Sequence, residues 1–387
     1  MDILKTVDLE KVVNWRRHFH MYPEVGFKEY EGSAYIAGEL EKYPGVEVLR
    51  PTKTSVVAVL KGGKPGKVIG MRADFDSLPI EEEADVPFKS KNPGVMHACG
   101  HDFHAAMLLG AIDVLHKMKD EIEGTIKFIF QHAEEVDPGG ASQIIATGVL
   151  DDVEAFYGSH VSAEDPVGML SAAPGPVYAN ADFFQVNIQG KGAHAARPDQ
   201  GIDTILVGSE VVLALNHIVS RNVKSSERAV LTIGKFHGGT AENIIPDTVT
   251  MGGTVRSYLP EVRELMEERI RAVAKGICLA HGAKEEVRYE KGYSAVVNNE
   301  ALYKLFLSYA AKVLPDADIK KMEPIMGGED FSAYGNIAPS LFVGIGANVE
   351  SENYYGHHHP KVRFNEDALP IGTALYVAFA LNVKEFF

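Results

Sequence analysis

The sequence is poor in cysteine and carries fewer basic than acidic residues, and both shortages exclude classes of protein. Two cysteines among 387 residues cannot form the disulfide framework of a small secreted domain, which favours a reducing compartment. Lysine and arginine number 38 against 53 aspartates and glutamates, so the net charge is −15. Because nucleic-acid binding needs a basic footprint, we expect no nucleic-acid partner.

Targeting and membrane segments are also missing. Residues 1–10 lack the basic-then-apolar order of a signal peptide. No apolar run reaches the length that crosses a bilayer. We therefore expect a cytoplasmic protein without a membrane partner. The apolar content of 45% is that of an ordinary globular protein, and the length predicts two domains.

The first part of the chain alternates between strand and helix patterns. Its strands are expected at 56–61, 67–71, 125–130 and from 154, and its helices at 8–17, 33–40 and 104–118. This order predicts an α/β domain with a largely buried sheet. From about residue 296 the chain returns to mixed helix and strand.

Residues 182–290 have a different rhythm, with the order β-α-β-β-α-β of a ferredoxin-like unit. The strands are expected at 182–189, 229–236, 248–257 and 285–289, and the helices at 202–219 and from Pro260. We interpret 182–291 as an α+β domain inserted into an α/β domain made of 1–181 and 292–387.

Residues 97–104 read His-Ala-Cys-Gly-His-Asp-Phe-His, just before an apolar stretch. Thiolate and imidazole are preferred ligands of borderline metals such as zinc. Cys99 and His101 are two apart, so in an extended segment their side chains leave the same side. The start of the following helix also favours an ionised thiol. The octapeptide therefore predicts metal ligation.

Other polar clusters follow apolar strands, namely 72–76, 132–135 and His160. Sites of open α/β sheets lie outside the carboxyl ends of strands, so these clusters point to one crevice. The pair Glu134 and Glu135 could supply one metal ligand and one general base. A third cluster is the histidine run 357–359, of which at most two members can face a site.

Seven motifs occur in an order that resembles a known family. They lie at 72–80, 96–102, 130–135, 158–161, 190–198, 327–331 and 358–360. The chain resembles the metal-dependent amidohydrolases that include hippurate hydrolase, N-acyl-amino-acid amidohydrolases and plant auxin–amino-acid conjugate hydrolases. They form the aminoacylase branch of the dinuclear metallopeptidases. The resemblance covers essentially the whole chain, starting near His20, and implies a metallopeptidase-like catalytic domain with an inserted lid and dimerisation domain.

This resemblance implies two divalent metal ions per subunit, which could be zinc, manganese, cobalt or nickel. The implied ligands are Cys99 as a bridging thiolate, His101, Glu135, His160 and His358. The family motif places the last ligand two residues before a proline, which selects His358 from the run 357–359. Glu134 falls on the general base.

Further roles follow from the same resemblance. His194 matches a histidine that helps to hold the tetrahedral intermediate, while Asn243 and Arg256 match residues that bind the substrate carboxylate. On residue type alone, Asn243 could equally be a turn residue and Arg256 a surface strand residue. Asp74 and Asp102 are expected to orient ligands.

The expected reaction is hydrolysis of an N-acyl amino acid, or of a small dipeptide treated as one. We expect a homodimer, or a larger assembly such as a tetramer, in which His194 serves the partner's metals.

The sequence departs from the family at three places. His132 stands where a proline is usual, Phe103 stands where a small residue is common, and the residues directly after His160 lack a proline that is common there. Three alternatives are a small dipeptidase or aminopeptidase on the same scaffold, a cysteine hydrolase that pairs Cys99 with His101 or His104, and a non-catalytic metal- or peptide-binding protein.

Overall fold

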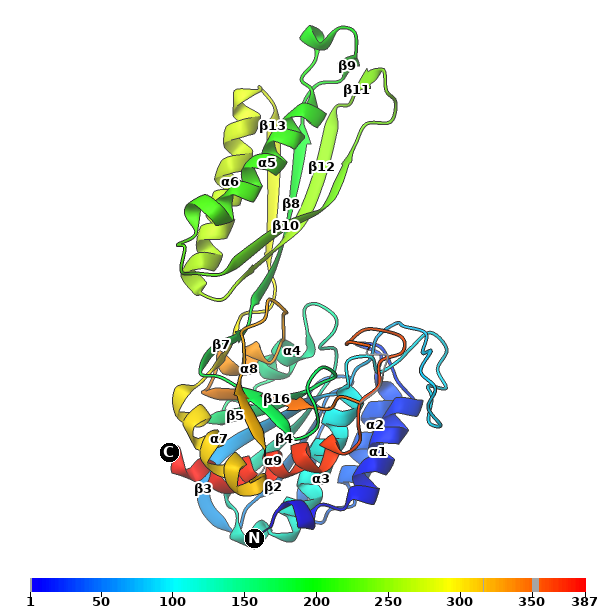
Figure 1. The fold of residues 1–387 in the computed structure, drawn as a ribbon, viewed down its shortest axis with the longest axis vertical. Helices are drawn as coiled ribbons and strands as arrows, with labels where there is room; N and C mark the ends of the chain where they lie inside the picture. Colours follow the sequence, from blue (N-terminus) through cyan, green and yellow to red (C-terminus); the bar gives the residue numbers. More distant parts are fainter. Residues whose placement is uncertain (1, 316, 350–354) are drawn as a thin grey trace. The chain divides into compact units, whose positions relative to one another are not determined.

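The structure is a computed structural model that describes residues 2–315, 317–349 and 355–387. The chain divides into two compact units (Figure 1). The first unit contains residues 1–177, 296–323 and 330–387, and the second contains 178–295 and 324–329. The inserted range therefore starts and ends a few residues outside the expected 182–291, and residues 324–329 group with it.

An eight-stranded mixed sheet forms the centre of the first unit, which confirms the predicted α/β class. In spatial order its strands are β1 (Val46–Leu49), β2 (Val56–Lys61), β4 (Glu123–Gln131), β3 (Lys64–Asp74), β5 (Ala155–Ser162), β16 (Ser340–Gly346), β6 (Met169–Ala172) and β15 (Asp318–Lys321). Neighbours from β4 to β16 run parallel, whereas β1, β2 and β4 pair antiparallel. A short pair, β7 (Gly175–Tyr178) and β14 (Val296–Asn298), stands apart.

Helices flank this sheet. They are α1 (Leu9–Met21), α2 (Tyr30–Leu40), α3 (His101–Lys117), α4 (Gly140–Ala146), α7 (Glu300–Val313), α8 (Ser332–Gly335) and α9 (Ala368–Asn382). α3 packs on β3, β4 and β5, and α9 packs on α3, β5 and β16. Residues 101–115 of α3 are all buried, because its neighbours cover it on every side. Its stretch from Ala105 to Ile112 is apolar on every face, and such a helix belongs in a core.

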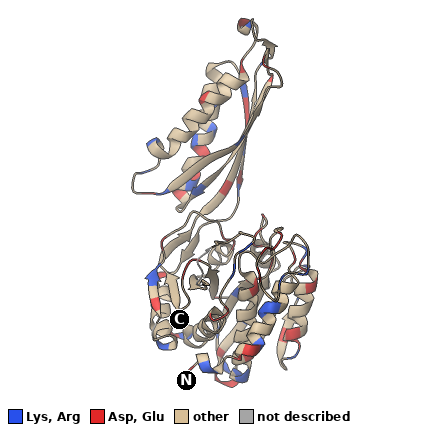
Figure 2. Ribbon diagram, turned by 45° about the vertical axis from the view of Figure 1, so that its right-hand side comes forward, with Lys and Arg blue, Asp and Glu red and all other residues tan. Residues whose placement is uncertain are grey.

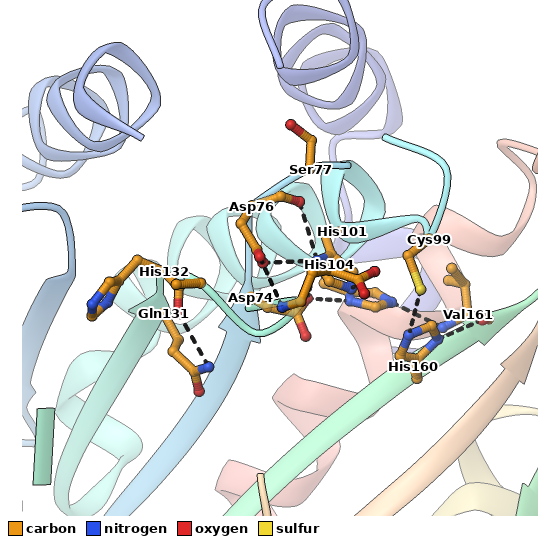
Figure 3. A network of polar contacts seen from close by, with 12 residues as sticks. Asp74, Asp76, Ser77, Cys99, His101, His104, Gln131, His132, His160 and Val161 are labelled. Carbon is orange, nitrogen blue, oxygen red and sulfur yellow. Dashed lines mark hydrogen bonds and ion pairs between the residues drawn. The ribbon is translucent and has the colours of Figure 1, made fainter. Parts of the chain in front are cut away.

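The parallel strands end together at one edge of the sheet. Asp74, at the end of β3, pairs with Gln131, at the end of β4. The polar residues that follow these strands therefore start side by side, and α3 begins at His101 close to them (Figure 3). The sheet thus fixes the place of the candidate site.

The second unit is a four-stranded antiparallel sheet with two helices. The sheet order is β10 (Ala229–Gly238), β12 (Thr248–Ser257), β8 (Asn180–Gln189) and β13 (Lys284–Lys291). α5 (Thr204–Asn222) and α6 (Pro260–Ala280) lie side by side on the sheet (Figure 1). A separate pair is formed by β9 (Ala193–His194) and β11 (Ile244–Ile245). The order of elements is the predicted ferredoxin-like one.

By length and composition alone, α5 could span a membrane, which differs from the expectation that no apolar run is long enough. One side of α5 packs on the sheet through Val207, Val211, Leu215 and Ile218. Its other side leaves Leu213 66% exposed. Length and composition are weak evidence, because helices of a folded core pass the same test.

Charged residues of both signs are interspersed over the helices of each unit (Figure 2). α6 carries this pattern, since Glu267 pairs with Arg271 one turn later.

Candidate metal centre

Cys99 and His101 lie on either side of a tight turn that opens α3. Gly100 between them has a φ of 91°, and a Cβ atom there would lie 2.3 Å from Cγ2 of Val161. Only glycine therefore fits this turn without a clash. The turn brings both side chains next to His160, at the end of β5 (Figure 3).

The imidazoles of His101 and His160 are held by their Nδ1 atoms. Nδ1 of His101 lies 3.0 Å from Oδ1 of Asp76, and Nδ1 of His160 donates to the carbonyl of Val161 at 2.7 Å. Nε2 of His160 is 3.4 Å from the Cys99 sulfur, and Nε2 of His101 is buried without a hydrogen-bond partner among the described residues. Both rings thus keep Nε2 available as a ligand atom.

The loop after β4 presents two carboxylates to the same place. Ala133 has a φ of 50°, a left-handed conformation that few non-glycine residues adopt, and it directs the chain into Glu134 and Glu135. The amide of Glu135 donates to Oδ2 of Asp76 at 3.0 Å. Oε1 of Glu135 lies 3.9 Å from Nε2 of His101. Glu134 is 8% exposed.

The three histidines of the run point in three directions. Nε2 of His358 lies 3.2 Å from Oε1 of Glu135. His357 has its Nδ1 3.8 Å from the Cys99 sulfur, and its Nε2 accepts from the amide of Ala163. His359 stacks on Tyr355 and takes no part in the cluster. His357 is a close neighbour of the cluster that sequence reasoning passed over, although it stands within a run that had already been singled out.

Five groups of potential ligand atoms result among the described residues, each with its atoms within 4.8 Å of one another, and three of the five combine two or more of the implied ligands. These three are Cys99, His101 and His160; Cys99, Glu135 and His358; and His101, Glu134 and Glu135. The first two groups share the Cys99 sulfur, so the arrangement offers two adjacent positions with the thiol between them. The unpartnered Nε2 of His101 sits at one of them. Thiolate, imidazole and carboxylate donors in this arrangement fit a pair of borderline divalent ions.

The electrostatics also favour a cation. Burial, together with the charges of Glu135 and Glu134, raises the pKa of the Cys99 thiol. For His101, burial acts against the charged form, but the charges of Asp74 and Asp76 prevail and raise its pKa to about 10. Carboxylates are therefore in excess around the cluster, and a bound cation would compensate them.

Asp76 is a carboxylate that contacts the candidate ligands directly, and the sequence placed it in the polar cluster 72–76 without indicating a role for it. It contacts the ring of His101 and the amide of Glu135. A signal was present, because Asp74 and Asp76 are two residues apart at the end of a strand and so point to the same side.

Asp74 and Asp102, which were expected to orient ligands, make their close contacts with residues other than the candidate ligands. Asp74 binds Nδ1 of His104 at 2.5 Å but is 3.8 Å from His101, and the His104 ring packs on His160. Asp102 instead binds Arg16 and His20 of α1, at 2.9 and 2.8 Å. Asp74 thus supports His160 through His104, and Asp102 anchors α3 to α1.

The remaining candidates lie in the second unit. His194 pairs with Ile244, and the amide of Ala195 donates to the carbonyl of Asn243 at 3.1 Å, so His194 and Asn243 are neighbours. Both are exposed. Arg256 lies near the opposite end of β12, where it donates to the carbonyl of Val255. Eight residues of strand separate Thr248 from Arg256, which is about 27 Å at about 3.4 Å per residue.

Comparison with known proteins identifies the class. Residues 70–382 match the model of Peptidase family M20/M25/M40. The chain is 45% identical to an N-acyl-L-amino acid amidohydrolase of Geobacillus stearothermophilus, over 77% of this chain and 81% of that one. It is 38% identical to an N-acetylcysteine deacetylase of Bacillus subtilis, over 97% of both chains.

A solved structure of similar fold also belongs to the M20 family. The Bacillus subtilis YXEP protein, described as a dinuclear metal-binding peptidase of the M20 family, has a TM-score of 0.85, is 35% identical, and covers 98% of this chain and 99% of its own. The chain belongs to Peptidase family M20/M25/M40. It is a hydrolase that acts on carbon–nitrogen bonds, as the resemblance predicted.

Proposed function

We propose that this protein is a metal-dependent amidohydrolase that cleaves the amide bond of N-acyl amino acids. One observation carries the proposal: Glu134 lies within 4.8 Å of the ligand-type atoms of His101 and Glu135. The cluster therefore holds one carboxylate more than the set of five ligands implied by the family resemblance. A protein that only stores metal has no use for such a base. The relatives named for N-acyl-L-amino acids and N-acetylcysteine support the substrate class.

Cys99, His101, Glu135, His160 and His358 would hold the metals. Bound metal ions would lower the pKa of a coordinated water and polarise the substrate carbonyl. Glu134 accepts the proton of the attacking water and then delivers it to the leaving nitrogen, so one carboxylate serves as base and as acid. The products are the free carboxylic acid and the amino acid.

We further propose that the second unit completes the site in a homodimer. His194 would stabilise the oxyanion, and Asn243 and Arg256 would bind the substrate carboxylate. Within one copy, His194 and Asn243 lie at the β9–β11 pair, which precedes Thr248 at the start of β12, and Arg256 lies about 27 Å along β12 from Thr248. A substrate of amino-acid size cannot span that distance, so two copies of the unit would have to contribute. The exposed Leu213 and the edge strand β10 offer surfaces for such pairing.

An activity screen tests the proposal. The metal-loaded protein is assayed with N-acetyl, N-benzoyl and indole-acetyl amino acids and with dipeptides, and Glu134→Gln serves as the inactive control. Release of free amino acid from at least one N-acyl substrate, absent in the control, is the expected result. Hydrolysis of dipeptides alone would replace the amidohydrolase by a small dipeptidase, and hydrolysis of none would remove the proposal.

The cysteine-hydrolase alternative is less favoured, because burial and nearby carboxylates raise the pKa of Cys99 and so disfavour a free thiolate nucleophile. A chelator separates the two, since a thiol enzyme would keep its activity. We also propose a cytoplasmic location, on the ground that Cys99 and Cys278 are both free thiols.

A further inference from the structure

Residues 24–29, Glu-Val-Gly-Phe-Lys-Glu, carry none of the candidate ligands, yet they lie between two loops that do serve the metal centre. On one side, the amide and the hydroxyl of Ser77 both donate to the carbonyl of Glu24, at 3.0 and 2.6 Å. This contact ties the segment to the loop that carries Asp76. On the other side, a Cβ atom on Gly26 would lie 2.8 Å from Val136 and 3.3 Å from Cα of Ala133. The segment therefore packs closely against the loop that carries Glu134 and Glu135.

Glu29 is the side chain that joins this segment to the catalytic loop. It is 1% exposed, and its Oε1 atom accepts two backbone hydrogen bonds, from the amide of Ala133 at 2.8 Å and from the amide of Phe27 at 3.0 Å. Both donors belong to left-handed residues, since φ is 50° at Ala133 and 65° at Phe27. Non-glycine residues avoid this conformation unless their surroundings hold them in it. One carboxyl oxygen thus holds two residues in the unfavourable left-handed backbone conformation.

The position of Ala133 gives this contact its significance. Ala133 immediately precedes Glu134, so its backbone angles set the direction in which the chain presents Glu134 and then Glu135. The next fixed point is the amide of Glu135, which Asp76 holds. Glu134 therefore stands between two amides that are each anchored by a buried carboxylate, Glu29 before it and Asp76 after it.

We propose that Glu29 is a positioning residue of the hydrolytic site, whose carboxyl oxygen holds the left-handed turn at Ala133 and so aims the general base Glu134. The proposal rests on the proposed function for the role of Glu134. The positioning role depends on the length of the Glu29 side chain, which brings Oε1 to the two amides, and not on the charge of its carboxyl group. Burial, and then the charge of Asp76, raise the pKa of Glu29 to about 7, although backbone hydrogen bonds and Thr54 act in the opposite direction. Oε1 can accept from both amides in either protonation state.

Two conservative substitutions separate the effect of side-chain length from the effect of charge. Glu29→Gln keeps an acceptor oxygen at the same distance but loses the charge. Glu29→Asp keeps the charge but withdraws the oxygen by one methylene. Glu29→Ala removes both. The matched control is Glu24→Ala. Glu24 belongs to the same segment, and its Oε2 also accepts a hydrogen bond from a backbone amide, at 2.8 Å. That amide belongs to Gly32 in the first turn of α2 and not to the loop that carries Glu134.

The first measurement needs no substrate and no metal. Hydrogen–deuterium exchange of the peptide covering 132–136 should become at least about tenfold faster in Glu29→Ala and Glu29→Asp, because the Ala133 amide loses its acceptor. It should stay near the wild-type rate in Glu29→Gln and in Glu24→Ala. Unchanged exchange in Glu29→Asp would overturn the proposal, even if Glu29→Ala fails to fold.

The second measurement is the rate of hydrolysis at saturating metal. Displacement of a catalytic group by about 1 Å can cost about 10²-fold, so kcat should fall by that order in Glu29→Asp and Glu29→Ala. KM should change by less than about threefold, because Glu29 does not touch the substrate. Glu29→Gln should retain the wild-type kcat. A kcat of Glu29→Asp equal to that of Glu29→Gln, or an equal loss in Glu24→Ala, would overturn the positioning role. If Glu134→Gln keeps full activity, the proposed function fails, and the exchange measurement still decides the contact of Glu29.

Discussion

The two units place their candidate site residues in different surroundings. In the first unit, His101 and Glu134 are buried, Cys99, Glu135 and His160 are half-buried, and only His358 of these six is exposed. A second residue holds two of the imidazoles in place: Asp76 holds His101, and the carbonyl of Val161 holds His160. In the second unit, His194 and Asn243 are exposed. The side chain of His194 accepts from the amide of Ala196, two residues along its own loop.

This difference indicates how each unit contributes. A group that is locked by packing is ready to act in the chain as folded, and it needs no further partner to fix its geometry. An exposed imidazole at the end of a short strand, such as His194 in β9, is screened by water, and it gains catalytic strength only after another surface covers it. The first unit is thus preorganised, and the second would be completed by association.

The largest effect should come from the preorganised base. Glu134→Gln should retain both metals and bind substrate, but lose at least about 10²–10⁴-fold in rate, because Glu134 moves a proton in two steps of the proposed mechanism. Glu135→Gln should instead lose metal. Metal analysis beside kinetics checks this, and a metal-depleted Glu134→Gln with an active, metal-replete Glu135→Gln would reverse the two roles.

The ligands come next. Cys99→Ser and His358→Ala should lower metal content and nearly abolish turnover, since Cys99 belongs to two ligand groups and His358 faces Glu135. His359→Ala is the matched control, because His359 stacks on Tyr355 instead. An empty His359→Ala beside a fully loaded His358→Ala would show that the ligand register is wrong by one residue.

These two experiments concern residues that the sequence indicated in two ways. The family resemblance, and not the pattern, assigned Glu134 as the base and selected His358 from the run 357–359, whereas the place of the site followed from a physical pattern. Apolar strands followed directly by polar residues predicted both the sheet and the edge at which its site lies, and the periodicity of residues 182–290 predicted the ferredoxin-like unit. The sequence did not predict the roles of Asp76, which was known only as a member of the cluster 72–76, and of Glu29, and both act on segments far away in the chain. Asp76 contacts residues 25 and 59 positions later, and Glu29 contacts one 104 positions later. No local period encodes such contacts.

The exposed histidine gives the next effect. His194→Ala should reduce the rate by about 10²–10³-fold, the usual loss for one oxyanion donor. If His194 serves the partner's metals, Glu134→Ala and His194→Ala chains should complement each other when refolded together. Random pairing makes half of the dimers mixed, each with one of two sites intact, so the mixture should recover roughly a quarter of wild-type activity. Subunit exchange without recovery would mean that His194 acts within its own chain or is not catalytic, and the contrast between the units would lose its functional meaning.

The smallest expected effect distinguishes the roles of two buried carboxylates near the candidate metal centre, Asp76 and Asp102. Asp76→Asn should weaken metal affinity by about 10–100-fold, the usual result of removing the partner of a ligating histidine. The amide can still accept from one donor, but it cannot hold both the His101 ring and the Glu135 amide as the carboxylate does. Asp102→Asn is the matched control, because Asp102 is equally buried but binds Arg16 and His20 of α1. It should lower the thermal unfolding temperature, since Arg16 and His20 would lose a buried charged partner, and should leave metal affinity within a few-fold of wild type. Titration of the apo protein with zinc or manganese measures both affinities. A larger loss of affinity in Asp102→Asn than in Asp76→Asn would return the ligand-orienting role to Asp102.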